Sequence, residues 1–375
     1  MRNTLLSKFL IVSALLMSFT SFAKDAKEAG EAPEKDKKTE IKEYIEHHLK
    51  DSHSFSLFSY TKDNGEHVYI DIPLPVIIWD EGLKVFSSSR FHHGETVAEV
   101  DGSYYKLYHN KIYETNADGE IRYGEDHKVL NEKPLDLSIT KNVVMIFITG
   151  LLILWMFSSL ARSYAKNNNM PKGIGRFMEP IVLYIRDEIA RPNIGEKRYR
   201  KYMPFLLTIF FFIWFLNIFG LTPLGVNVTG NIAITFALAL MTFLITSFTG
   251  TKTYWKHLFD PLGDTMPWIA KIPLYIILVP IELLGTIVKP FSLLIRLYAN
   301  MTAGHIVLMS LIGLMFIFKS WIGSPLSFAL AFAISLIEVL VALLQAYIFT
   351  MLSALYFGFA SEEHHEEHEG EIAHL

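Results

Sequence analysis

The sequence predicts an all-α membrane protein of five transmembrane helices, with a small β-rich domain outside the membrane near the N-terminus. Three observations support this fold class. The 375-residue chain is 51% hydrophobic with a mean hydropathy of +0.29, more than a soluble core requires. Between Lys201 and Lys252 about fifty residues contain no Asp, Glu, Lys or Arg, enough for two spans of about twenty residues each. Short β-prone runs instead occupy residues 55–131.

Residues 1–23 have the pattern of a secretory signal peptide. Arg2 and Lys8 flank the start of an apolar stretch, and small residues near Ala23 suit a cleavage site. We predict cleavage there, with an uncleaved anchor as the alternative. Residues 24–54 form a charged linker, because Lys, Glu and Ala predominate in them.

Residues 55–136 are predicted to form the β-rich extension. Residues 67–72 and 104–113 are β-prone, and residues 116–119 are a turn signal. The pair His92-His93 has no further ligands at a recognisable spacing, so surface histidines are favoured over a metal site. The chain contains no Cys, which excludes disulfides and thiolate chemistry.

The first predicted span, residues 143–160, is just long enough to cross a bilayer. Basic residues follow it closely: Arg162, Lys166, Lys172 and Arg176. The positive-inside bias therefore places this end in the cytoplasm, in agreement with a secreted N-terminus. Residues 176–201 mix charged and apolar side chains and predict an amphipathic helix at the cytoplasmic surface.

Four further spans complete the predicted membrane domain, which covers residues 137–360. They are residues 203–222, 232–249, 272–318 and 326–360, with a turn at 223–225. The fourth span approaches 70 Å at 1.5 Å per residue, so it must tilt or break, with Pro280 and Pro290 as candidate kinks. We predict that the last two spans form a long tilted hairpin.

Residues 361–375 form an acidic, His-rich tail on the cytoplasmic side. Four histidines lie in it, and a divalent-ion site is one interpretation. A disordered acidic tail is favoured, because the sequence indicates no fixed ligand geometry.

Charged and amide side chains within the last two spans carry the main functional signal. Arg296 keeps its proton at any accessible pH, and a charge at mid-bilayer costs from about 3 to more than 10 kcal/mol. Glu282, Lys289 and Arg296 are seven residues apart and lie along one slowly drifting helical stripe. Asn300 follows Arg296 by one turn on nearly the same face.

The final span adds Glu338 and Gln345, seven residues apart on a shared face. If Gln345 lies level with Arg296 in an antiparallel hairpin, His305 and Glu338 are displaced by about 13 and 10 Å toward the external side. A Glu and a His in a partly hydrated, low-dielectric wall suit a proton relay, because their pKa values can be tuned across the working range.

Less specific interpretations remain open for several of these residues. A structural ion pair is one alternative for Glu282 and Lys289, and snorkelling to the interface is another for Lys289. Asn300 and Gln345 alternatively hydrogen-bond across helices as packing contacts, worth about 0.6 to 2 kcal/mol.

Two other protein classes compete with an ion-path interpretation. A secondary transporter or stand-alone channel also places paired charges at mid-membrane, but the chain holds no second copy of the Arg296 region. An adhesin or receptor anchored by its helices needs only one span and leaves the hairpin charges unexplained.

The region around Arg296 resembles the a subunit of the F-type ATP synthase. That family's fifth-helix pattern corresponds to Lys289, Pro290, Ser292, Arg296, Leu297, Asn300, Ala303 and Gly304. Glu282 matches the upstream acid and Gln345 the sixth-helix glutamine. The resemblance covers residues 137–360.

Two departures from the family pattern stand out. Many bacterial members carry the acid on the fifth helix and the histidine on the sixth, whereas here His305 and Glu338 exchange those places, as in mitochondrial-type members. The signal peptide and the extension before about residue 136 are absent from shorter members.

The resemblance implies a non-catalytic, proton-translocating stator subunit that presents two half-channels to a rotating ring of c subunits. Arg296 is expected to separate the half-channels by its fixed charge. His305 and Glu338 are expected in the external one. The sequence leaves Na⁺ open as the ion in place of H⁺.

The remaining residues receive supporting roles from the same resemblance. Asn300 and Gln345 are expected to orient groups near the arginine, and Glu282 and Lys289 to lie toward the cytoplasmic exit. Expected partners are the c ring, the b-subunit peripheral stalk, other ATP synthase subunits and the lipid of a bacterial inner membrane. The extension is expected to be periplasmic. No cofactor, metal or nucleic acid is expected.

Overall fold

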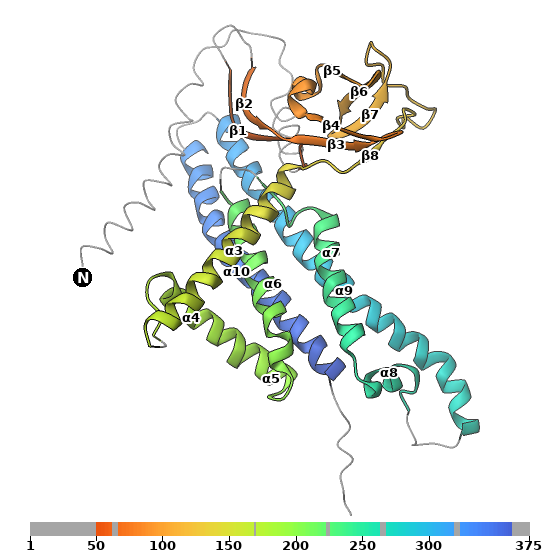
Figure 1. Ribbon diagram of the computed structural model, residues 1–375, viewed down its shortest axis with the longest axis vertical. Coiled ribbons are helices and arrows are strands. Elements are labelled where there is room, and N and C mark those ends of the chain that lie inside the picture. Colours follow the sequence, from red (N-terminus) through yellow and green to blue (C-terminus); the bar gives the residue numbers. More distant parts are fainter. Residues whose placement is uncertain are drawn as a thin grey trace, which may run out of the picture. The chain divides into compact units, whose positions relative to one another are not determined.

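Five long helices dominate the computed structural model, which describes residues 50–61, 67–168, 170–222, 226–262, 268–318 and 323–361 (Figure 1). Each is long and apolar enough to cross a membrane: α3 (Lys141–Lys166), α6 (Tyr199–Gly220), α7 (Ile232–Thr249), α9 (Trp268–Phe318) and α10 (Gly323–Ser361). The mostly helical fold class is confirmed, with five helices among the described residues that are candidates to span the membrane. The predicted signal peptide, most of the charged linker, the 223–225 turn and nearly all of the acidic tail lie outside the described residues.

The β-rich region is present before α3. Its strands are β1 (Ser54–Thr61), β2 (His67–Pro73), β3 (Pro75–Trp79), β4 (Leu83–Ser87), β5 (Val97–Val100), β6 (Ser103–Tyr108), β7 (Lys111–Thr115) and β8 (Leu135–Asp136), with a 3-10 helix η2 (Ser88–Gly94) after β4. They pair antiparallel in the orders β1-β2, β4-β3-β8 and β5-β6-β7. The predicted turn at 116–119 is present, and in it the Gly119 N–H donates a hydrogen bond to the Asn116 carbonyl at 2.9 Å.

This region has a small core of its own. Alternate residues of β3, Val76 and Ile78, are buried with Phe91 and Tyr105, as period-two patterning requires. At the edge of this core Tyr105 donates a hydrogen bond to Asp80, which holds the pKa of that carboxyl below its ordinary value. The β-rich region therefore packs as a folded unit around its own apolar residues.

The predicted amphipathic stretch forms three short helical segments. These are α4 (Ile174–Tyr184), the π-helical η3 (Ile185–Ala190) and α5 (Arg191–Ile194). Asp187 accepts hydrogen bonds from Arg186 and Arg191 at 2.7–2.8 Å. Gly195, at φ 90°, ends the last segment because that backbone conformation suits glycine.

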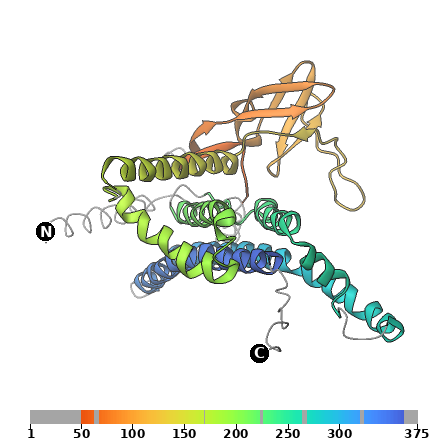
Figure 2. The ribbon, with the colours of Figure 1, turned by 60° about the horizontal axis from the view of Figure 1, so that its bottom comes forward.

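Helices α9 and α10 lie side by side and run in opposite directions (Figures 1 and 2). α9 continues as one helix for 51 residues through Pro273, Pro280 and Pro290. The span was predicted either to tilt or to break, and the structure has no break in it. Such a helix is about 75 Å long, more than twice the ~30 Å hydrocarbon core of a bilayer. Helices α6 and α10 share the largest buried cluster with α3, α7 and the middle of α9, and this packing positions the polar residues described next.

Candidate functional site

Arg296 lies on α9 next to the packed interior. Its neighbours Leu293, Leu294 and Leu297 are buried, while Arg296 itself is half-buried. None of the residues that the structure describes forms a hydrogen bond or an ion pair with its guanidinium. The charge is close enough to Tyr356 of α10 to interact with it electrostatically. Arg296 is thus a fixed cation in a long apolar helix without a compensating carboxylate among the described side chains.

The two amides predicted near the arginine differ in exposure. Asn300 is exposed, whereas Gln345 of α10 has only 4% of its surface exposed. Ile295 and Ile306 are exposed as well, and eleven residues apart they share one face of α9. This face, the uncovered stripe, is left exposed by this chain, and Asn300 lies about 140° around the helix from Ile295.

His305 is buried at the far end of the same region, with 5% of its surface exposed. Its Nε2 has no hydrogen-bond partner among the described residues. A Cβ added to Gly220, at the end of α6, would lie 3.3 Å from this nitrogen and 3.3 Å from the Val226 carbonyl oxygen. The imidazole therefore borders the connection between α6 and α7.

Glu338 lies against α9 at the residue before His305. A Cβ on Gly304 would overlap the Glu338 carboxylate, so glycine at this position permits the approach of the acid. The structure thus brings Glu338 and His305 to neighbouring turns of the helix pair, although within the described chain they share no hydrogen bond or ion pair.

Two further buried polar atoms, on residues that the sequence analysis did not assign, lie in the α6–α7 connection and on α9. Asn227 Nδ2 and Thr302 Oγ1 are buried and, like His305 Nε2, find no partner in the described part of the chain. Asn217 is fully buried and accepts a hydrogen bond from Thr229 at 2.7 Å. An unpartnered buried polar group costs about 1–3 kcal/mol, and such groups are commonly served by ordered water. The clue in the sequence was the pair of polar residues, Asn227 and Thr229, in a long uncharged stretch.

Lys289 lies on the opposite side of Arg296, among aromatic rings. Its Nζ is 5.5 Å from the Phe359 ring centre and 5.9 Å from that of Tyr356, within cation–π range. Glu282 and Lys289 form no ion pair in the described residues. The ion-pair alternative for these two is therefore not realised in this conformation.

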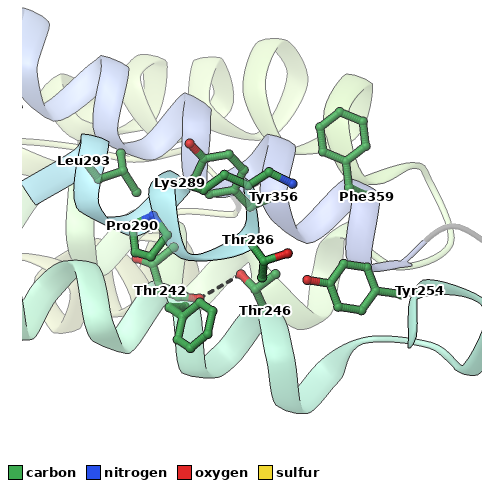
Figure 3. A pocket seen from close by; sticks show the side chains of 10 residues that line it. Thr242, Thr246, Tyr254, Thr286, Lys289, Pro290, Leu293, Tyr356 and Phe359 are labelled. Carbon is green, nitrogen blue, oxygen red and sulfur yellow. Dashed lines mark hydrogen bonds between the residues drawn. The ribbon is translucent and has the colours of Figure 1, made fainter. Parts of the chain in front are cut away.

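Beside Lys289 is a small cavity of about 20 Å³, room for about one water molecule. Figure 3 shows Thr246 and Tyr254 on one side of it and Lys289 on the other. Tyr254 belongs to α8 (Lys252–Phe259), and burial raises the pKa of its hydroxyl, while a hydrogen bond with Thr286 acts in the opposite direction. Thr286 itself donates to the Glu282 carbonyl at 3.0 Å, so hydroxyl groups link Tyr254 to the turn that carries Glu282.

The described residues contain no group of three or more His, Asp or Glu side chains placed to hold a metal ion. His92, one of the two histidines considered above, is exposed on η2.

Two family models match the chain. Residues 143–358 match the family described as ATP synthase A chain, and residues 44–137 match a family described as a domain of unknown function. All seven predicted site residues lie in the first match.

Individual relatives carry the same designation. ATP synthase subunit a of Chloroherpeton thalassium is 46% identical over 246 residues, covering 64% of this chain and 70% of the relative. ATP synthase subunit a of Myxococcus xanthus is 44% identical over 254 residues, covering 66% and 81%. ATP synthase subunit a 2 of Prosthecochloris aestuarii is 40% identical over 317 residues, covering 80% and 94%. That last alignment is too long for the membrane helices alone and reaches back into the β-rich region.

Proposed function

The chain belongs to the ATP synthase A chain family, and from this premise we propose that it translocates protons through the membrane sector of an ATP synthase. It is a non-catalytic stator subunit that provides two aqueous half-channels, one from each side of the membrane. Arg296 is the charge gate between them. Na⁺ remains the alternative ion.

The observation that carries this proposal is the uncompensated charge of Arg296 in an apolar helix. A guanidinium neither accepts a proton nor loses its own at accessible pH, so it interrupts a water wire. Its charge also favours the ionised form of a carboxylate that passes by. Lysine is inferior in this role, because burial can discharge it.

His305 and Glu338 belong to the external half-channel. Three buried polar atoms without partners, on His305, Thr302 and Asn227, support this assignment because they suit a hydrated path. Glu338 reaches α9 over Gly304, the residue that precedes His305, and this approach supports placing the acid and the imidazole in the same half-channel.

Glu282 and Lys289 lie toward the cytoplasmic exit. The cavity beside Lys289 and its hydroxyl lining support a polar route there. Near the gate, Asn300 and Gln345 orient groups around Arg296, with Asn300 exposed and Gln345 in the interior.

The uncovered stripe of α9 and the exposed apolar side chains of α10 form the surface for the rotating c ring. Leu336, Ile337, Leu340 and Leu344 of α10 are exposed in the single chain, as expected of a face that meets another subunit or lipid. The b-subunit peripheral stalk and other synthase subunits are the further partners. The subunit lies in a bacterial inner membrane as a steeply tilted hairpin with supporting helices, its extension periplasmic and its C-terminus cytoplasmic.

The decisive experiment measures ATP-driven proton pumping and passive proton leak in inverted membrane vesicles that carry Arg296→Ala. We expect pumping to be abolished in a normally assembled complex, because the gate charge is gone. Arg162→Ala is the matched control, since it removes an exposed arginine near the end of α3, and it should pump normally. Unchanged pumping with Arg296→Ala would contradict the proposal and favour the transporter or anchor interpretations.

A further inference from the structure

In the connection between α6 and α7, residues 226–229 are unusual because they are irregular in backbone and yet buried. Val226, Asn227, Val228 and Thr229 are each 4% exposed or less. Connecting segments normally run over the surface, where water satisfies their backbone groups. Something must cover this connection.

Part of the cover comes from the N-terminal extension. Phe55 of β1 and Leu74, just before β3, are 9% and 8% exposed, and both belong to one buried apolar cluster with Val226 and Val228. Met145 of α3 and Leu216 of α6 complete that cluster. The extension therefore shares a hydrophobic core with the membrane domain at the point where the connection is held.

The segment that leads into Phe55 is also fastened to the start of α3. The Asp51 carboxylate accepts a hydrogen bond from the Asn142 N–H at 3.2 Å, and the Ser52 carbonyl accepts one from the Lys141 N–H at 3.0 Å. These N–H groups have no partner inside the helix. Asn110, from the β6–β7 turn, donates to the Asp51 carbonyl at 2.6 Å and ties the rest of the extension to the same point.

A second polar contact closes this attachment on the other side. His53 Nε2 lies 3.0 Å from the carboxylate of Asp136, a residue five positions before the start of α3 at Lys141. Burial acts to raise the pKa of Asp136, but hydrogen bonds from His53 and Ser138 hold it at about 2. The contact thus joins a side chain of the segment before β1 to an ionised carboxylate of β8.

The opposite side of the connection faces His305. The Val226 carbonyl and the His305 imidazole both approach Gly220 within 3.3 Å of the place a Cβ would occupy. Val226 and the imidazole therefore border the same residue, Gly220, through which a shift of Val226 can reach the imidazole. Phe55 and Leu74 thus pack in the cluster that contains Val226, and His305 lies near the Val226 carbonyl. The connection therefore separates the extension from the site.

We propose that the extension is a brace in which Phe55 and Leu74 hold residues 226–229 in position beside His305. It is a positioning element for proton uptake from the external side, and this role rests on the proposed assignment of His305 to the external half-channel. The two residues act through the connection and touch no ion themselves.

The test uses the assembled complex and measures proton conduction per complex in membranes that carry Phe55→Ala, Val228→Ala or both. Each single variant should slow conduction. The fold-loss of conduction in the double variant should be much smaller than the product of the two single fold-losses. We expect the product of the single fold-losses to exceed the fold-loss of the double variant by about threefold or more, within the range of coupling between residues of one packed cluster. Phe55→Leu keeps an apolar side chain in the cluster and should restore most of the rate.

Trp79→Ala is the matched control, because Trp79 is an exposed aromatic residue of the same extension and lies outside this cluster. It should leave conduction unchanged. If Phe55→Ala prevents assembly, Leu74→Val takes its place in the same cycle. Independent effects of the two substitutions, or equal effects of Trp79→Ala and Phe55→Ala, would overturn the brace.

The failure of the brace is distinguishable from that of the proposed function. If Arg296→Ala abolishes pumping while Phe55→Ala conducts normally, only the brace is wrong. If Arg296→Ala pumps normally, the function on which the brace rests is wrong, whatever the extension variants do.

Discussion

The polar residues on the two sides of Arg296 differ in whether their polar atoms have partners. On the His305 side, the imidazole is buried and its Nε2 lacks a partner among the described residues. On the other side, the Lys289 cation lies against two aromatic rings and borders a cavity with hydroxyl groups.

This difference indicates different tasks for the two sides. Unpartnered groups that can change protonation state suit proton exchange with water. A lysine whose ammonium lies over aromatic faces is instead held in place by cation–π contacts. Substitutions on the His305 side should therefore reduce proton conduction most strongly.

Among substitutions on the two sides of Arg296, the largest effect is expected from Gly304→Ala on the His305 side. The added Cβ would displace the Glu338 carboxylate, and because that carboxylate ends a flexible side chain, the helix pair itself need not move. A misplacement of about 1 Å can cost on the order of 100-fold in a rate that depends on geometry. We expect conduction per complex to fall about 10- to 100-fold while assembly is unchanged, since alanine favours a helix over glycine.

Gly285→Ala is the control for this substitution, because no atom lies within 4 Å of the added Cβ on the same helix. It should conduct like the wild type. If both variants lose conduction equally, the effect comes from a change in α9 as a whole, and the proposed difference between the two sides is wrong.

Much of the fold could be predicted because a bilayer demands long uncharged segments. The predicted span 232–249 coincides with α7 (Ile232–Thr249). α3 extends to Lys166, beyond the predicted 143–160, because hydropathy reports the apolar part of a helix and not its charged ends. The joining of β8 to β3 across more than fifty residues was beyond prediction, since periodicity carries no information on distant strand pairing.

The site was predictable only along each helix. Spacing in the sequence placed Arg296 and Asn300 on nearly one face, and in the structure Arg296 is half-buried and Asn300 is exposed. The approach of Gly220 to His305 depends on how the α6–α7 connection folds, which helical spacing does not specify. For the same reason the sequence did not reveal the unpartnered Asn227.

A smaller effect is expected from Lys289→Met on the other side of the arginine. Methionine keeps an unbranched apolar stem against the two rings but removes the charge. A charge at Lys289 that lowers the barrier to ion release by about 1 kcal/mol accounts for about a fivefold faster conduction, and its removal should slow conduction by that factor. Lys289→Arg is the control, because it keeps the charge and stacks on aromatic rings. If Lys289→Met reduces conduction as much as Gly304→Ala does, the two sides of Arg296 contribute equally to conduction and the proposed difference between them is wrong.

The smallest effect is expected from Tyr254→Phe, which removes the hydroxyl that bonds Thr286 beside the cavity. A hydrogen bond of this kind contributes about 0.5–1.5 kcal/mol net, and Thr286 retains its bond to the Glu282 carbonyl. Thermal unfolding of the complex should therefore shift down slightly, while conduction changes by no more than about twofold. If conduction instead falls as far as with Lys289→Met, the Tyr254 hydroxyl takes part in ion release, and the cavity beside Lys289 is a segment of the ion path as well as a packing gap.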